Sequence, residues 1–268
     1  MSILKVGIIG YGAIGPTLHT LLKKHARNVQ VVAILDREAS VEAARARAGE
    51  TPVTHQLADF LAFEPDIVVE CAGHAALRAH GIAVLDGGCD LIVSSVGALA
   101  DTEIEAALRS AAQRTRNRLV IPSGAVGGLD ALAAARPSGI DEVSYTSRKK
   151  PIAWTGTPAE KMIDLSAIAE PTPFFSGNAR EACLTFPQNA NVVAAIAIAG
   201  IGFEKTRVTL MADPDTPGNR HDIVAHGTFG TISSSVVTRT LPENPKTSML
   251  APYSVMRSIL NMAGPVII

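Results

Sequence analysis

The sequence has little excess charge of either sign, no long apolar run and few cysteines. Its 24 Lys and Arg residues nearly balance 25 Asp and Glu residues, so the formal net charge is −1. Without a basic excess, the composition offers no electrostatic basis for binding nucleic acid or an anionic membrane. Although 47% of the residues are hydrophobic, no uninterrupted apolar run reaches the roughly 18 residues of a transmembrane helix.

The three cysteines, Cys71, Cys89 and Cys183, are scattered and form no C-x-x-C pair. This spacing argues against a disulfide framework or a zinc site and fits a reducing compartment. The N-terminus reads as an apolar strand rather than a basic segment followed by an apolar leader. We therefore expect a cytoplasmic protein with no metal site and with no nucleic-acid or membrane partner.

The first 120 residues alternate between short apolar runs and helical patterns. The apolar runs predict strands over Ile3–Ile9, Val29–Leu35, Asp66–Glu70, Asp90–Val93 and Arg118–Ile121. The helical patterns fall on Ile14–His25, Val41–Ala48, Ala75–Leu85 and Asp101–Arg114. Such alternation is typical of α/β proteins, in which a parallel sheet is covered by helices on both faces.

The first predicted strand runs into Gly10-Tyr11-Gly12-Ala13-Ile14-Gly15, which has the G-x-G-x-x-G spacing. The first glycine permits a tight turn, the second lets the backbone approach a pyrophosphate, and the third lets the helix pack closely. The alternative is a glycine-rich turn that only packs a helix on the sheet. We favour a Rossmann-type dinucleotide-binding domain over residues 1–122. Gly10, Gly12, Ala13, Ile14 and Gly15 are its expected cofactor contacts.

A carboxylate follows the second predicted strand, because Asp36 stands 21 residues after Gly15. Asp36 can accept hydrogen bonds from the adenosine ribose and repels a 2′-phosphate, which favours NAD over NADP. Arg37 beside it offsets part of that repulsion, so we expect NAD as cofactor with some use of NADP. Since ligands bind at the carboxyl ends of parallel strands, Ala72 and Gly73 after the Asp66–Glu70 strand are further expected contacts.

The pattern changes at residue 123. A backbone-exposing linker, residues 122–128, leads into a predicted helix over Leu129–Ala135 and a strand over Glu142–Arg148. A helix over Asn191–Gly200 and strands over Lys205–Ala212, Arg220–His226 and Gly230–Val237 follow. Successive strands look antiparallel here. We therefore expect a second α+β domain over residues 123–240, with a mainly antiparallel sheet that carries catalysis and pairs two chains into a homodimer.

The last segment, residues 241–268, predicts a C-terminal helix that returns to the first domain. Thr247 or Ser248 is the expected N-cap of that helix, because a hydroxyl at this position accepts from free N–H groups of the first turn.

Histidine is the first candidate for proton transfer, since its ordinary pKa lies near neutral pH. His19, His25 and His80 fall within or at the ends of predicted helices and are interpreted as surface residues. His221 and His226 share a strand but are five positions apart, so they point to opposite faces. His221 follows a loop rich in turn-forming residues, where a catalytic side chain is plausible. The alternative is a solvent-facing strand histidine.

Two further features have both a functional and a structural interpretation. Cys71 ends a predicted strand and could serve as a nucleophile, but no activating cation is near it in sequence, and a small buried apolar side chain is the usual role. The run Arg148-Lys149-Lys150 could bind a substrate carboxylate, or it could be a solvated face.

Several longer strings in the second half together resemble the L-aspartate dehydrogenase family. They are Pro122-Ser123-Gly124-Ala125-Val126-Gly127-Gly128-Leu129-Asp130-Ala131-Leu132, Phe175-Ser176-Gly177-Asn178-Ala179-Arg180-Glu181-Ala182, Phe186-Pro187-Gln188-Asn189-Ala190-Asn191-Val192, Ala212-Asp213-Pro214, Asn219-Arg220-His221 and Asn244-Pro245-Lys246-Thr247-Ser248. The resemblance extends over essentially the whole chain, with Val126 as a mild departure from the expected isoleucine. It implies that His221 is the catalytic histidine and that Ala125 and Asn191 contact the cofactor.

The resemblance also implies an activity. It is the NAD(P)-dependent oxidative deamination of L-aspartate to oxaloacetate and ammonia through iminoaspartate, together with the reverse reaction. Iminoaspartate can feed NAD biosynthesis, which makes that pathway a natural context. Two alternatives stay open on the sequence. One is another two-domain reductase, similar to homoserine dehydrogenase or dihydrodipicolinate reductase, and the other is a non-catalytic NAD-sensing protein.

Overall fold

The computed structural model describes residues 3–241 and 244–267, and the chain divides into two compact units. Unit 1 takes in the chain up to Pro122 and again from Ala251 onward, and unit 2 runs over Ser123–Leu250.

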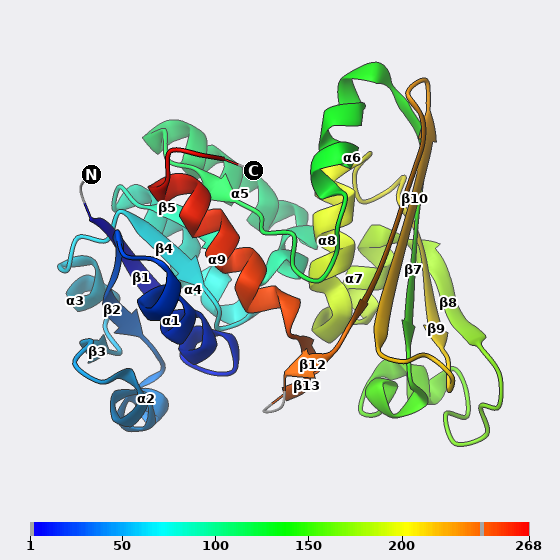
Figure 1. The fold of residues 1–268 in the computed structure, drawn as a ribbon, viewed down its shortest axis with the longest axis horizontal. Coiled ribbons are helices and arrows are strands. Elements are labelled where there is room, and N and C mark those ends of the chain that lie inside the picture. Colours follow the sequence, from blue (N-terminus) through cyan, green and yellow to red (C-terminus); the bar gives the residue numbers. More distant parts are fainter. Residues whose placement is uncertain (1–2, 242–243, 268) are drawn as a thin grey trace. The chain divides into compact units, whose positions relative to one another are not determined.

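Unit 1 is built on a six-stranded sheet in the order β3-β2-β1-β4-β5-β6, in which every pairing is parallel (Figure 1). Its strands are β1 (Leu4–Ile9), β2 (Val29–Leu35), β3 (Val53–Thr54), β4 (Ile67–Glu70), β5 (Asp90–Val93) and β6 (Leu119–Val120). The predicted Rossmann-type parallel sheet is confirmed. The short strand β3 was not predicted, because two residues are too few to show a period.

Helices cover both faces of the unit 1 sheet. They are α1 (Ile14–His25), α2 (Val41–Ala48), α3 (Leu57–Leu61), α4 (His74–Asp86), α5 (Thr102–Thr115) and α9 (Leu250–Ala263). Val6 and Ile8 of β1 point to one face and share a core with Leu22 of α1 and Ile259 of α9. The C-terminal helix therefore packs in the core of unit 1. The Asn28 side-chain amide also donates to the Ala263 carbonyl at its end, over 2.7 Å.

Unit 2 contains a five-stranded sheet in the order β11-β10-β7-β9-β8 and a small sheet of β12 and β13. Its strands are β7 (Ile140–Lys149), β8 (Thr172–Asn178), β9 (Arg207–Ala212), β10 (Asn219–Gly227), β11 (Gly230–Thr238), β12 (Thr240–Leu241) and β13 (Asn244–Ser248). The predicted second domain with a mainly antiparallel sheet is confirmed. One pairing differs from the antiparallel arrangement expected of successive predicted strands: β7 and β9, between which β8 was not predicted, pair in parallel.

Helices α6 (Leu129–Ala135), α7 (Ala179–Thr185) and α8 (Ala190–Ala199) gather on one face of the five-stranded sheet (Figure 1). Burial alternates along the central strands as a result. On β7, Tyr145, Ser147 and Lys149 are buried, whereas Thr146 and Arg148 between them are half-buried. Neighbouring residues on β7 therefore meet different environments, and the two basic residues at its end, Arg148 and Lys149, differ in burial for this reason.

The hydroxyl expected to cap α9 lies one residue before the N-cap position, because the helix begins at Leu250. The Ser248 hydroxyl accepts a hydrogen bond from the Leu250 N–H over 3.1 Å. Among the residues that the structure describes, no single helix is long and apolar enough to cross a membrane. One pair, residues 179–185 and 187–199, reaches that length together but is bent by 116°.

Candidate functional site

The three spaced glycines form the turn between β1 and α1, and each has a distinct packing environment. Gly10 has a φ of +91°, and a Cβ there would lie 2.5 Å from Ala72 Cα. A Cβ on Gly15 would lie 2.3 Å from the Gly10 carbonyl oxygen, so the helix approaches the turn more closely than any side chain permits. At Gly12 a Cβ would meet no atom within 4 Å. The turn is therefore tight on two sides and open on the third, as a pyrophosphate cradle requires.

Asp36, directly after β2, has a structural role that is separate from its predicted contact with the ribose. Its carboxylate accepts hydrogen bonds from the Tyr11 N–H over 2.9 Å and from the Arg37 N–H over 2.8 Å. The first bond fixes the middle of the glycine turn from the neighbouring strand. The Arg37 side chain is exposed and lies 3.5 Å from the Ser40 hydroxyl.

A cavity of about 670 Å³ lies at this edge of unit 1. Its lining includes Gly10, Gly12, Asp36, Arg37, Ala72 and Ala76. The volume falls within the range of small-molecule and cofactor sites. Open space at Gly12, a carboxylate beside it and the N-terminus of α1 make the residues present fit a dinucleotide.

Cys71 at the same edge is unsuited to nucleophilic chemistry. Burial raises the pKa of its thiol, and the neighbouring Glu70 carboxylate raises it further. A thiol held in its protonated form is a poor nucleophile. This favours the structural interpretation of Cys71.

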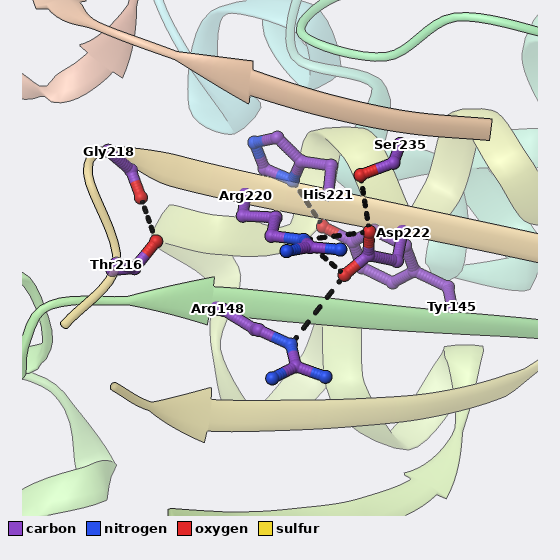
Figure 2. Close-up of polar contacts among 8 residues, drawn as sticks. All are labelled: Tyr145, Arg148, Thr216, Gly218, Arg220, His221, Asp222 and Ser235. Atoms are coloured by element: carbon purple, nitrogen blue, oxygen red, sulfur yellow. Dashed lines mark hydrogen bonds and ion pairs between the residues drawn. The ribbon is translucent and has the colours of Figure 1, made fainter. Parts of the chain in front are cut away.

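His221 lies on β10 in unit 2 and is 4% exposed, on the face covered by helices. Its Nδ1 is 2.7 Å from the hydroxyl oxygen of Tyr145 on the neighbouring strand β7. The two rings stack almost in parallel, at an interplanar angle of 8°. Figure 2 shows the second ring nitrogen pointing away from Tyr145. Tyr145, which the sequence did not single out, thus fixes the orientation of the imidazole and leaves Nε2 for other partners.

The imidazole of His221 is held neutral. Burial lowers its pKa to about 3, the positive charge of Lys149 lowers it as well, and Asp222 opposes both. Burial also raises the pKa of the Tyr145 hydroxyl, which therefore keeps its proton. A neutral ring beside a neutral hydroxyl can exchange donor and acceptor roles at Nδ1.

The opposite face of the same strands holds a separate ionic cluster (Figure 2). Arg148 lies 3.6 Å from the Asp222 carboxylate, and Arg220 donates to that carboxylate over 2.9 Å. The Ser235 hydroxyl donates to Asp222 over 2.6 Å. Since Arg148 and Arg220 are engaged there, they are poor candidates for binding a substrate beside His221.

Lys149 is the member of the basic run that shares the face of His221. It is 7% exposed, although lysine is rarely buried. Its ammonium donates to the side-chain oxygen of Asn189 and lies 4.9 Å from the ring centroid of Trp154. Ser147 pairs with His221 across the ladder, so Lys149 is a diagonal neighbour within reach of a long side chain. Lys150, the next residue, is exposed.

The other two residues implied by the resemblance also lie in unit 2. Ala125 is buried in the segment after β6, and Asn191 is an exposed residue in the first turn of α8. Asn191 follows shortly after Asn189, the partner of Lys149. Unit 2 therefore contains His221, Lys149, Ala125 and Asn191, while the glycine turn, Asp36, Ala72 and Gly73 belong to unit 1. Their roles toward cofactor and substrate stay predictions.

Two of the remaining histidines differ from expectation. His19 and His80 are half-buried rather than surface residues, and His19 Nδ1 lies 2.8 Å from the Tyr11 hydroxyl. His25 is exposed, as predicted, and so is His226, whose position confirms the opposite-face argument. Within residues 3–241 and 244–267, no group of three or more His, Cys, Asp or Glu side chains is arranged to hold a metal ion.

In the comparison with known proteins, one family model matches the chain up to Pro122 and a second one begins shortly after it. A family model described as homoserine dehydrogenase, NAD binding domain, matches residues 10–122. A second model, described as aspartate dehydrogenase, C-terminal, matches residues 130–262. NAD(P) as cofactor is thereby confirmed.

Individual relatives extend over nearly the whole chain. The chain is 43% identical to an L-aspartate dehydrogenase of Polaromonas sp., over 99% of its own length and 100% of that protein. It is 39% identical to an L-aspartate dehydrogenase of Pseudomonas aeruginosa, over 97% of its length and 98% of that protein. The crystal structure of aspartate dehydrogenase from Thermotoga maritima aligns with a TM-score of 0.74 at 26% identity, covering 99% of both chains. A homoserine dehydrogenase from Thiobacillus denitrificans, at 16% identity and a TM-score of 0.63, shares the fold over 98% of this chain and 73% of its own. The resemblance read from the sequence motifs is confirmed, and the chain belongs to the L-aspartate dehydrogenase family.

Proposed function

We propose that this chain catalyses the NAD(P)-dependent oxidative deamination of L-aspartate to oxaloacetate and ammonia through iminoaspartate, and the reverse reductive amination. The observation that carries the proposal is the buried, hydrogen-bonded His221 in a chain that is 43% identical to a full-length L-aspartate dehydrogenase. A homoserine dehydrogenase-like or dihydrodipicolinate reductase-like activity, or NAD sensing without turnover, is not favoured.

NAD(P), when bound, supplies an acceptor for the hydride that leaves the amino-bearing carbon of the substrate. The glycine turn and Asp36 would hold its pyrophosphate and adenosine ribose. Ala72, Gly73, Ala125 and Asn191 are the further proposed contacts. His221 acts on the substrate side, at Nε2. Because the Tyr145 hydroxyl can donate to or accept from Nδ1, Nε2 can take a proton from the water that adds to the imine. It can also give a proton to the departing ammonia.

Lys149 is the proposed partner of a substrate carboxylate. Aspartate and oxaloacetate carry two carboxylates, and a buried ammonium beside the catalytic histidine can bind one of them through a charge-assisted hydrogen bond. A carboxylate on Lys149 would also offset the positive charge that lowers the His221 pKa. Substrate binding would then make His221 a better proton acceptor at the moment when it is needed.

The face of the five-stranded sheet that lies opposite helices α6, α7 and α8 supports a homodimer. Helices α6, α7 and α8 lie on the other face (Figure 1), whereas this face presents the Arg148, Arg220 and Asp222 cluster and Val237, which is 49% exposed. Opposite charges and an apolar side chain on one patch can pair with the same patch of a second copy across a two-fold axis.

Sedimentation velocity should show a dimer, and Val237→Asp should shift the equilibrium toward the monomer. A wild-type monomer at micromolar concentration would contradict the proposal.

His221→Ala should lower kcat for aspartate by about 10²- to 10⁴-fold, because proton transfer at Nε2 is lost. NADH affinity, measured by fluorescence titration, should stay unchanged. His226→Ala is the matched control, since His226 is exposed on the same strand and faces the other way. Turnover of His221→Ala at the wild-type rate would remove His221 from the mechanism. If wild-type enzyme with NADH and ammonia reduced another 2-oxo acid but not oxaloacetate, the substrate itself would be wrong.

Lys149→Met should raise the KM for oxaloacetate by about 10- to 100-fold, the usual effect of losing a hydrogen bond to a charged group. Cofactor affinity should not change. Lys150→Met removes the adjacent but exposed ammonium and should leave KM within about twofold of wild type. Equal effects of the two substitutions would show that Lys149 acts only through general electrostatics.

The buried neutral His221 also makes stability depend on pH. An unfolded chain takes up a proton on this ring below its ordinary pKa of 6.5, whereas the folded chain does not until about pH 3. The contribution of His221 is therefore complete above pH 6.5 and is lost as the pH falls. Between pH 6 and 4, wild type should lose up to about 1.4 kcal/mol per pH unit more unfolding free energy than His221→Ala. Urea denaturation at several pH values measures the two unfolding free energies. An equal dependence on pH in wild type and His221→Ala would refute the prediction.

A further inference from the structure

We propose that Glu70 is the positioning residue that fixes the two loops on which the nicotinamide half of the dinucleotide rests. Glu70 is the last residue of β4 and is 1% exposed. It lies at the carboxyl end of the strand, where ligands of parallel sheets bind. The proposal rests on NAD(P) binding in the proposed function, and it assigns to that site a residue that does not itself touch the cofactor.

The Glu70 carboxylate is surrounded by donors from both loops. Its Oε1 accepts from the N–H of Ala72 over 2.8 Å and from the N–H of Gly73 over 2.7 Å. The Ser95 hydroxyl donates to Oε1 over 2.9 Å, and the Ser95 N–H donates to Oε2 over 3.0 Å. One side chain therefore joins the segment after β4 to the segment after β5, 25 residues later in the chain.

These contacts favour an ionised carboxylate. All four partner groups donate to it in this arrangement, and the three N–H groups among them cannot accept a hydrogen bond from a protonated carboxyl. Burial raises the pKa of Glu70, while the hydrogen bonds from Gly73, Ser95 and Ala72 oppose that shift. A buried charge held by backbone dipoles is costly to disturb, because loss of one partner leaves the others unsatisfied.

Glu70 holds the corner formed by Ala72 and Gly73. This corner also borders the glycine turn. Gly73 has a φ of +122°, a conformation that favours glycine, and its N–H points to Glu70. A Cβ on Gly10 would lie only 2.5 Å from Ala72 Cα, so the turn after β1 packs directly against this corner. A shift of Ala72 would therefore alter the space available beside Gly10.

The strand order places this corner away from the adenosine end. Asp36 follows β2 on one side of β1, whereas Ala72 follows β4 on the other side. The cavity of about 670 Å³ is lined from both sides of the glycine turn. With the adenosine ribose at Asp36 and the pyrophosphate at the turn, the nicotinamide half extends over the ends of β4 and β5. Those are the two loops that Glu70 joins.

The test compares two ligands on one variant. Glu70→Gln keeps the side-chain shape but replaces an acceptor by an NH₂ group that faces donors. NADH should bind about tenfold more weakly to Glu70→Gln, as expected for loss of a hydrogen bond to a charged group. Binding of 5′-AMP, which occupies only the adenosine end, should stay within about twofold. Calorimetry measures both affinities without turnover, so the result is independent of whether aspartate is the substrate.

Glu64→Gln is the control, because Glu64 is a well-exposed carboxylate of the same unit, paired with Lys5 at 3.5 Å. It should leave both affinities unchanged. Unchanged NADH binding by folded Glu70→Gln would overturn the proposal, and so would an equal loss of NADH and AMP binding, which would indicate a general structural role. If Glu70→Gln does not fold, Ser95→Ala removes a single donor and should weaken NADH binding about two- to threefold with AMP unaffected. No change in NADH binding by Ser95→Ala would then overturn it.

Discussion

Burial of ionisable side chains is the constraint on which both units depend, because a polar atom removed from water must find its partners within the fold. Unit 1 meets this constraint by surrounding the Glu70 carboxylate with N–H and hydroxyl donors. Unit 2 meets it by keeping His221 neutral and giving its Nδ1 a hydroxyl partner. In each case the solution fixes a backbone segment or a ring to which we assign a role in the proposed function.

The same constraint explains why charges separate on β7. Arg148 and Lys149 are adjacent, so strand geometry sends them to opposite faces. The half-buried face pairs Arg148 with Asp222, and the helix-covered face receives Lys149, which is held by Asn189 and Trp154. Of these three adjacent basic residues, 148–150, Lys149 alone is buried, so the proposed substrate carboxylate would meet one ammonium there rather than three cations. Such a single point of charge suits recognition of a small dicarboxylate better than a diffuse basic patch does.

Local patterns in the sequence predicted the parts of the fold that local physics determines. The glycine spacing predicted the turn after β1, and strand–helix alternation predicted the parallel sheet. Strand β8 escaped prediction because its pairing is irregular between Pro173 and Phe175 and its burial does not alternate. The parallel pairing of β7 with β9 escaped as well, since the order of strands in a sheet depends on tertiary contacts that periodicity does not encode.

The candidate site shows the same division. Alternation indicated that His221 and His226 face opposite ways, but only the packing of helices on one face decides which of them is buried. Its place after a turn-rich loop made His221 a candidate and the resemblance to a family singled it out, whereas its partner Tyr145 lies 76 residues away in the chain. The sequence indicates Glu70 only as the end of a strand, because its four hydrogen bonds exist only once two separate loops meet.

Asp36 couples the choice of cofactor to the shape of the phosphate-binding turn. The carboxylate that would repel a 2′-phosphate is also the acceptor for the Tyr11 N–H in the middle of that turn. Evolution or engineering toward NADP by replacing Asp36 would therefore leave this N–H without its acceptor unless the new side chain, or the phosphate itself, took over the bond. Cofactor exchange in this chain is consequently a problem of backbone support as much as of charge, and single substitutions at Asp36 face a cost that a change on an open surface would not.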